Sequence, residues 1–137
     1  MADTAAGPLS GIRILVVDDN EDNRDVFVQS LRLMGAEVQG AASAEAAVGL
    51  SEGADIVVTD FALPDHDGAW LLEQVTRRPL TVPVILLSGF TATQRPAIAD
   101  APFVRKMLKP VEPADLAKVV LDVLGRVGQG EPTPSAP

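Results

Sequence analysis

The sequence predicts an α/β fold: a doubly wound, five-stranded parallel sheet with helices on both faces. Short apolar runs alternate with helical patterns about five times, which is typical of βαβ units and a parallel sheet. The runs are continuously apolar rather than alternating, as expected for strands that helices cover on both faces. In a chain of 137 residues this pattern favours the flavodoxin-like strand order 2-1-3-4-5, whose switch point lies between the first and third strands.

The strand candidates are short apolar runs, each of which ends in a polar residue. They are Ile14–Val17, Ile56–Thr59, Val84–Leu87 and Phe103–Leu108. Parallel strands end at a common edge of the sheet, and open α/β sheets bind their ligands there. The residues that follow the runs are therefore candidates for a site.

The first two helices have a core-facing stripe or a capping residue. Phe27, Leu31 and Met34 are spaced i, i+4 and i+7, and Gly35 occupies the position expected just after a helix end. Ser43 is a plausible N-cap for a helix over 44–50.

The later helices are marked by their boundaries. Asp67-Gly68 precedes a helix through Leu71, Leu72 and Val75, and Pro113 opens a helix over 114–124 before Gly125. A further helix is expected between Ser88 and Phe103. Two prolines, Pro96 and Pro102, restrict it to about two turns, so we expect it to be the most labile element.

Composition predicts a single domain over residues 11–125. Residues 1–10 are small and polar, and residues 126–137 are rich in glycine and proline, so both are predicted to be disordered tails. We expect no output domain after residue 125. The chain is then either a stand-alone protein or a domain taken from a longer one.

Several function classes conflict with the composition. There is no cysteine, which excludes disulfides and thiolate metal sites and fits a cytoplasmic location. The N-terminus does not resemble a secretory signal, and no apolar stretch approaches the ~18 residues that would span a bilayer. A net charge of −8 argues against nonspecific nucleic-acid binding.

Four of the expected strands end in residues suited to phosphoryl chemistry. Asp18 and Asp19 follow the first run, Asp60 follows the second, and Ser88 and Lys109 follow the last two. Three carboxylates brought together repel one another, and a divalent cation relieves that repulsion. An all-oxygen site without histidine or cysteine suits Mg²⁺, with Mn²⁺ as a second choice.

The same residues supply a nucleophile and two phosphoryl ligands. Asp60 could attack phosphorus to give an aspartyl phosphate, Lys109 could place a charge on a phosphoryl oxygen, and Ser88 could donate a hydrogen bond to another. A hydrolase would also need an acid–base group. The position two residues after Asp60 is Ala62, and the only histidine, His66, lies in the loop beyond.

Each of these residues also has an ordinary structural interpretation. The aspartates could cap a helix or end a strand, Ser88 could belong to a turn, and Lys109 could be a solvated surface lysine. The case for a site depends on their occurring together, in order, at successive strand ends. Asp65 and Asp67, which flank His66, are interpreted as a solvated turn.

At these residues the chain resembles the receiver domains of two-component response regulators, especially the receivers of hybrid sensor kinases. The resemblance spans roughly residues 11–125. It is carried by 14–20 (Ile-Leu-Val-Val-Asp-Asp-Asn), Asp60 with Leu63-Pro64 and Asp67-Gly68, Ser88-Gly89, and Lys109-Pro110.

The resemblance implies a role for each matching residue. Asp60 would be the phosphoacceptor, Asp19 would bind Mg²⁺ directly and Asp18 largely through water, and the backbone carbonyl of Ala62 would be a further metal ligand. Ser88 and Lys109 would contact the phosphoryl group, and the Lys109–Pro110 bond would be cis. The phosphodonor would be a phosphohistidine on a histidine kinase or a histidine phosphotransfer domain. The chain would not be an enzyme beyond its own phosphorylation and dephosphorylation.

The sequence departs from the receiver pattern at one position. Lys106 stands where receivers usually carry the aromatic residue of their conformational switch, and Phe103 is not placed to replace it. We therefore predict that activation is read mainly from the loop and short helix after Ser88. Ala62 and Phe90 offer no polar side chain to guide water, which predicts slow self-dephosphorylation.

Two alternative functions remain open at this point. One is an Mg²⁺-dependent phosphohydrolase with Asp60 as its nucleophile. The other is a non-phosphorylated interaction module whose acidic pocket is vestigial. On the first helix, Val26 and Leu33 lie off the core stripe; they either bind a helix of the phosphodonor or extend the edge of the core.

Overall fold

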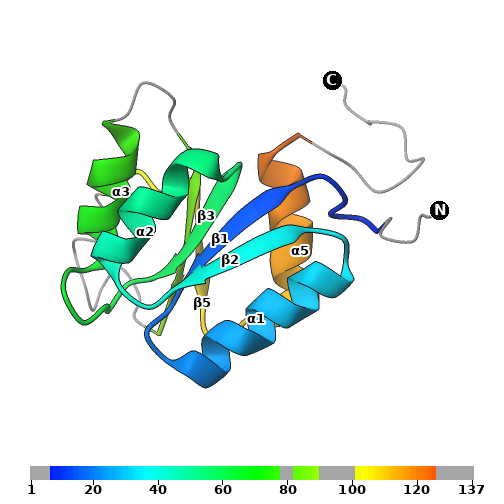
Figure 1. Cartoon of the computed structure of the whole chain (residues 1–137), viewed down its shortest axis with the longest axis horizontal. Coiled ribbons are helices and arrows are strands. Elements are labelled where there is room, and N and C mark those ends of the chain that lie inside the picture. The colour runs from blue at the N-terminus through cyan, green and yellow to red at the C-terminus, as the bar shows by residue number, and fades with distance from the viewer. Residues whose placement is uncertain (1–6, 78–81, 90–100, 126–137) are drawn as a thin grey trace.

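The computed structural model describes residues 7–77, 82–89 and 101–125. Their strands form one parallel sheet in the order β2-β1-β3-β4-β5, as predicted (Figure 1). The strands are β1 (Arg13–Val17), β2 (Glu37–Ala41), β3 (Ile56–Asp60), β4 (Val84–Ser88) and β5 (Arg105–Leu108).

Helices cover both faces of this sheet. In the described ranges they are α1 (Glu21–Leu33), α2 (Ala44–Leu50), α3 (Gly68–Thr76) and α5 (Pro113–Val123), with a 3₁₀ turn, η1 (Ser51–Gly53), after α2. Helices α1 and α5 lie on one face, and α2 and α3 lie on the other (Figure 1). The predicted doubly wound α/β architecture is therefore confirmed.

The core has two halves because successive strand residues point to opposite faces. Ile14, Val16 and Val58 pack toward α1 and α5, whereas Leu15 and Val57 pack toward α2 and α3. All five side chains are at most 2% exposed. Strands buried on both faces explain the continuously apolar runs in the sequence.

The helix boundaries follow the local signals of the sequence. The Asn20 side chain caps α1 by accepting a hydrogen bond from the Asn23 N–H at 2.9 Å, and Gly35 ends this segment with a φ of 104°. Ser43 caps α2 in the same way. Pro113 occupies the first turn of α5.

Two sequence-based boundaries differ from the structure, and two further predictions fall outside it. The prediction that residues 1–10 are a disordered tail is wrong for residues 7–10, because Leu9 is fully buried and its N–H donates to the Met34 carbonyl at 2.9 Å. The last strand begins at Arg105 rather than Phe103. The helix predicted after Ser88 and the tail at 126–137 lie outside the described residues.

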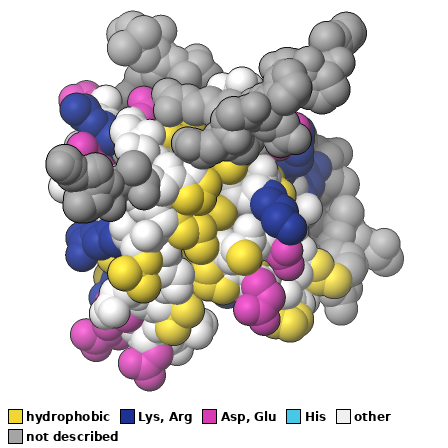
Figure 2. Space-filling view, turned by 90° about the vertical axis from the view of Figure 1, so that its right-hand side faces the viewer, with side chains coloured by type: hydrophobic (Ala, Val, Ile, Leu, Met, Phe, Trp, Pro, Cys, Tyr) yellow, Lys and Arg dark blue, Asp and Glu magenta, His cyan; other side chains and the backbone are white. Residues whose placement is uncertain are grey.

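Figure 2 shows the side of the molecule on which α1 and α5 lie. Hydrophobic side chains form a band across this face, and acidic and basic side chains flank it. The most exposed large apolar side chain in the described ranges is Leu33 on α1, at 88%. None of the described helices is long and apolar enough to cross a membrane.

Candidate functional site

The predicted site residues lie together at the carboxyl edge of the sheet. Asp60 ends β3 beside Leu87 of β4, and Ser88 ends β4 beside Leu108 of β5. Asp18 directly follows β1, and its N–H donates to the Ala41 carbonyl at the end of β2. Parallel pairing therefore brings residues from four strands to one rim.

Lys109 connects the acidic residues at this rim. Its Nζ lies 3.2 Å from Asp60 Oδ2 and 3.9 Å from Asp18 Oδ2. Its backbone N–H donates to the Ser88 carbonyl at 2.8 Å, so the lysine is anchored to the end of β4. The Lys109–Pro110 peptide bond is cis, as the resemblance implied.

Burial gives Asp60 an unusual electrostatic setting. The Asp60 side chain is only 16% exposed and that of Asp18 only 7%. Desolvation by burial raises the pKa of the Asp60 carboxyl above its ordinary value. Lys109 opposes this rise and the charge on Asp18 adds to it, so the ionised carboxylate is only partly compensated.

The acidic residues have a donor set that fits a hard divalent cation. Asp18, Asp19 and Asp60 each offer a carboxylate oxygen, and these oxygens lie within 4.8 Å of one another. Asp18 Oδ1 accepts a hydrogen bond from the Asn20 N–H at 2.9 Å, which fixes the orientation of that carboxylate. Oxygen ligands alone suit Mg²⁺ or Mn²⁺. A dication would also offset the incompletely compensated charge on Asp60.

The loop after Asp60 is held close to that residue. The Phe61 N–H donates to Asp60 Oδ1 at 2.8 Å, and the Gly68 N–H donates to the Phe61 carbonyl at 2.7 Å. A Cβ on Gly68 would lie 2.9 Å from the Asp60 carbonyl oxygen, so only glycine allows this approach. Ala62 pairs with Asp67 in an antiparallel bridge, which fixes its backbone within the same loop.

The interpretation of Asp65 and Asp67 as a solvated turn is wrong. Both Asp65 oxygens accept backbone hydrogen bonds at the start of α2, from Ala44 and Glu45, each at 2.9 Å. Asp67 caps α3 by accepting from the Trp70 N–H at 2.9 Å. No local signal indicated the first contact, because Asp65 lies 21 and 20 residues from its two donors.

The structure agrees with the departure noted at Lys106. Lys106 is an exposed residue of β5, paired with Leu86 of β4. Phe103 is 7% exposed and packs in the core beneath α2 and α3, so it is not available at the rim. Phe90 lies outside the described residues.

One residue beside the site was missed in the sequence. The Arg24 Nη1 donates to the Asp18 carbonyl at 2.8 Å, and the side chain crosses β2 over Gly40. An isolated glycine inside a strand is a sign of close approach by another group. Gly40 was therefore the sequence feature that could have indicated the approach of Arg24.

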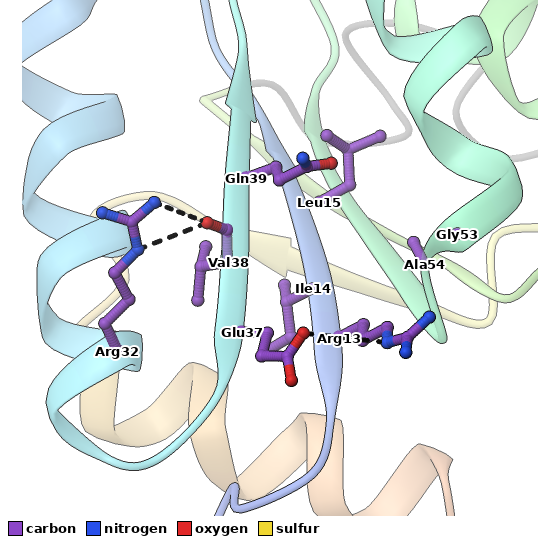
Figure 3. A pocket seen from close by; sticks show the side chains of 9 residues that line it. All are labelled: Arg13, Ile14, Leu15, Arg32, Glu37, Val38, Gln39, Gly53 and Ala54. Carbon is purple, nitrogen blue, oxygen red and sulfur yellow. Dashed lines mark hydrogen bonds and ion pairs between the residues drawn. The ribbon is translucent and has the colours of Figure 1, made fainter. Parts of the chain in front are cut away.

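A cavity of about 540 Å³ lies away from this rim, beside β1 and β2. Figure 3 shows that its arginines do not converge: Arg32 reaches from α1 to the Val38 carbonyl, and Arg13 points to the other side of β2. Arg13 Nε lies 3.8 Å from a Glu37 carboxylate oxygen. Because Arg32 is bound to the Val38 carbonyl and Arg13 lies near Glu37, the two guanidinium groups do not form one anion-binding site in this cavity.

The comparisons with known proteins agree with the fold. The family model for the response regulator receiver domain matches residues 14–121. An uncharacterized 14.6 kDa protein of Leptolyngbya boryana is 35% identical over 82% of this chain and 89% of its own length. The response regulator FleR of Pseudomonas aeruginosa is 30% identical over 87% of this chain, which spans only 25% of FleR.

Solved structures give the same answer. A CheY-like receiver domain protein from Methanospirillum hungatei is 29% identical, with a TM-score of 0.75 over 83% of this chain and 94% of that one. The BeF3-activated DrrB receiver domain is 25% identical, with a TM-score of 0.74 over 84% of this chain and 98% of that one. The strand order, the acidic rim and the match over residues 14–121 together show that this chain belongs to the response regulator receiver domain family.

Proposed function

We propose that this chain is the phosphoacceptor module of a two-component or phosphorelay system. In this proposal a phosphoryl group passes from a phosphohistidine to Asp60 with Mg²⁺, and the aspartyl phosphate changes partner binding. The observation that carries the proposal is the placement of Lys109 Nζ, 3.2 Å from Asp60 Oδ2, beside the oxygens of Asp18 and Asp19.

The transfer itself requires little from the protein beyond position and charge. An Asp60 oxygen attacks phosphorus, the phosphorus–nitrogen bond of the donor breaks, and the imidazole nitrogen keeps the electron pair and takes a proton from water. Lys109 is placed to pair with the Asp60 carboxylate before the transfer and with the phosphoryl oxygens after it. Mg²⁺ or Mn²⁺ held by Asp18, Asp19 and Asp60, with the Ala62 carbonyl as a further ligand, would supply positive charge to the phosphoryl oxygens.

Ser88 is proposed as a further contact of the phosphoryl group. It is 2% exposed and ends β4, and its carbonyl is bound by the Lys109 N–H. A hydroxyl at this point of the rim could donate a hydrogen bond to a phosphoryl oxygen.

A groove beside the site supports donor docking on α1. It has a volume of about 400 Å³ and is lined by Asp18, Asn23, Val26, Phe27, Lys109, Pro110 and Val111. Val26 is 54% exposed there, so a helix of a histidine kinase or phosphotransfer domain could bury it while its histidine reaches the rim. We further propose that the protein is cytoplasmic and catalyses only its own phosphorylation and dephosphorylation. We propose no nucleic-acid or membrane partner.

Intact-mass measurement tests this function. Wild type and Asp60→Asn are incubated with phosphoramidate, which carries a phosphorus–nitrogen bond, with Mg²⁺ or with EDTA. Wild type with Mg²⁺ should gain the mass of one phosphoryl group, and the other samples should not. A vestigial pocket would leave wild type unmodified, and steady turnover of p-nitrophenyl phosphate would indicate a phosphohydrolase instead.

A further inference from the structure

Arg24 is the only basic residue among positions 18–24, and its guanidinium donates to the backbone of the acidic pair Asp18-Asp19. It lies in the second turn of α1 and is half-buried. Its Nη1 donates to the Asp18 carbonyl oxygen at 2.8 Å. That oxygen belongs to the peptide group that joins Asp18 to Asp19. The hydrogen bond from Arg24 therefore restrains the backbone that carries both carboxylates.

The fold makes room for this contact on the edge strand β2. A Cβ built on Gly40 would lie 3.0 Å from Arg24 Cδ and 3.3 Å from Cγ. A methyl group at Gly40 would therefore press on the arginine stem, which would have to shift by a few tenths of an ångström. The stem of Arg24 lies over the one position of β2 that carries no side chain, which sets the direction of the guanidinium.

The two aspartates differ in how much else holds them. Asp18 is 5% exposed, its N–H donates to the Ala41 carbonyl, and its Oδ1 accepts from the Asn20 N–H. Asp19 is exposed, so the direction of its carboxylate depends mainly on its backbone. Restraint of the Asp18–Asp19 peptide group therefore matters most for Asp19.

We propose that Arg24 is a positioning residue for Asp18 and Asp19, which sets the affinity of this site for Mg²⁺. The inference rests on the proposed function, because it assumes that these carboxylates bind the cation. Loss of a group that orients metal ligands commonly weakens metal binding on the order of tenfold or more. A positioning role and a simple charge effect predict opposite outcomes, since a nearby guanidinium by its charge alone would repel Mg²⁺.

The test is calorimetric titration of the intact chain with Mg²⁺. We expect Arg24→Ala to raise the dissociation constant about tenfold. Gly40→Ala should raise it by a smaller factor, since the added methyl group shifts the Arg24 stem without deleting it. Arg24→Lys keeps the charge and one donor and should recover part of the affinity.

Arg32→Ala is the matched control. Arg32 lies on the same helix and also donates to a backbone carbonyl, that of Val38 at 3.3 and 2.7 Å, but away from the rim (Figure 3). Its loss should leave the dissociation constant unchanged. Thermal unfolding of each variant reports whether it is folded. If Arg24→Ala does not fold, the dissociation constants of Gly40→Ala and Arg24→Lys test whether Arg24 sets the affinity for Mg²⁺.

A second readout separates positioning from a general loss of structure. The Mg²⁺ concentration for half-maximal phosphorylation should rise in Arg24→Ala, whereas the rate at saturating Mg²⁺ should stay close to that of wild type. Affinity in Arg24→Ala equal to or tighter than wild type, or equal weakening in Arg32→Ala, would overturn the role of Arg24. Wild type that binds no Mg²⁺ would overturn the proposed function itself.

Discussion

At the scale of the residue, Asp60 combines burial with only partial charge compensation. Lys109 lies 3.2 Å away, yet burial and the Asp18 charge keep the pKa of the Asp60 carboxyl above its ordinary value. The folded protein therefore holds the Asp60 proton more tightly than the unfolded chain does. Ionisation of Asp60 therefore lowers the stability of the folded protein. A bound cation, or a substitution that removes the Asp60 charge, should raise that stability.

Asp60→Asn should unfold at a higher temperature than wild type at pH 7 without metal. Because the folded pKa of Asp60 is raised, wild type should lose stability relative to Asp60→Asn as pH rises from about 4 through that raised pKa. Mg²⁺ should then stabilise wild type more than Asp60→Asn. Thermal unfolding of both proteins at several pH values, with and without Mg²⁺, measures this. A wild type that gains stability over Asp60→Asn as pH rises would contradict it.

Asp65 has the opposite pH dependence. Partial desolvation raises the pKa of its carboxyl, but backbone N–H donors at Glu45, Ala44 and His66 more than offset this, so the pKa lies below its ordinary value. Its contribution to stability is present above the unfolded pKa and lost as pH falls through the folded pKa. Asp65→Ala should lower the unfolding temperature at pH 7, and the difference from wild type should shrink in acid. Asp25→Asn, which removes an exposed carboxylate on α1, is the control and should leave the unfolding temperature at pH 7 close to that of wild type.

At the scale of the element, the β3–α3 loop is fixed by close backbone contact. The first residue of α3, Gly68, leaves no space for a methyl group, since a Cβ would lie 2.9 Å from the Asp60 carbonyl and 3.2 Å from Phe61 Cα. Both neighbours are backbone atoms, which cannot move aside as a flexible side chain can. The position of Asp60 and the start of α3 are thus coupled.

Gly68→Ala should therefore destabilise the protein by about 1–3 kcal/mol, the usual cost of forcing an extra methyl group into a packed site. It should also slow phosphorylation of Asp60. Gly49→Ala in α2 is the control, because its Cβ would meet nothing within 4 Å. Alanine is the better helix former, so that variant should gain about 0.5–1 kcal/mol. Denaturant unfolding measures both, and equal stability of the two variants would refute the steric argument.

Elements whose signals are local were predictable, and long-range contacts were not. The apolar strands, the cap at Ser43 and the glycine after α1 depend on neighbouring residues, and the structure confirms them. The burial of Leu9 against Met34 and the docking of Asp65 on α2 join segments twenty or more residues apart. Polarity alone made both look like solvated segments.

At the scale of the whole molecule, the parallel sheet explains why the rim could be predicted at all. Once four runs are strands of one parallel sheet, their ends must meet, and the side chains of Asp18, Asp60 and Lys109 do meet there. FleR is about four times as long as the part of it that this chain covers, so its wider activity says little about this chain.

The lifetime of the proposed aspartyl phosphate depends on the residues that surround Asp60 in the folded molecule. Two residues beyond Asp60, Ala62 offers no polar group to guide water to phosphorus. We expect slow dephosphorylation, and Ala62→Glu should shorten the lifetime by supplying a carboxylate that orients water. Decay of the phosphorylated mass over time measures this, with Ala62→Val as the apolar control. A wild-type half-life of seconds would contradict the prediction.

The most direct test of the central claim is to locate the phosphoryl group by chemistry. Borohydride reduces an acyl phosphate at aspartate to homoserine, and peptide mass spectrometry identifies the residue so converted. After phosphorylation in Mg²⁺, homoserine should be found at position 60 alone. Homoserine at Asp18 or Asp19, or none in a sample shown to carry a phosphoryl group, would contradict the assignment of Asp60.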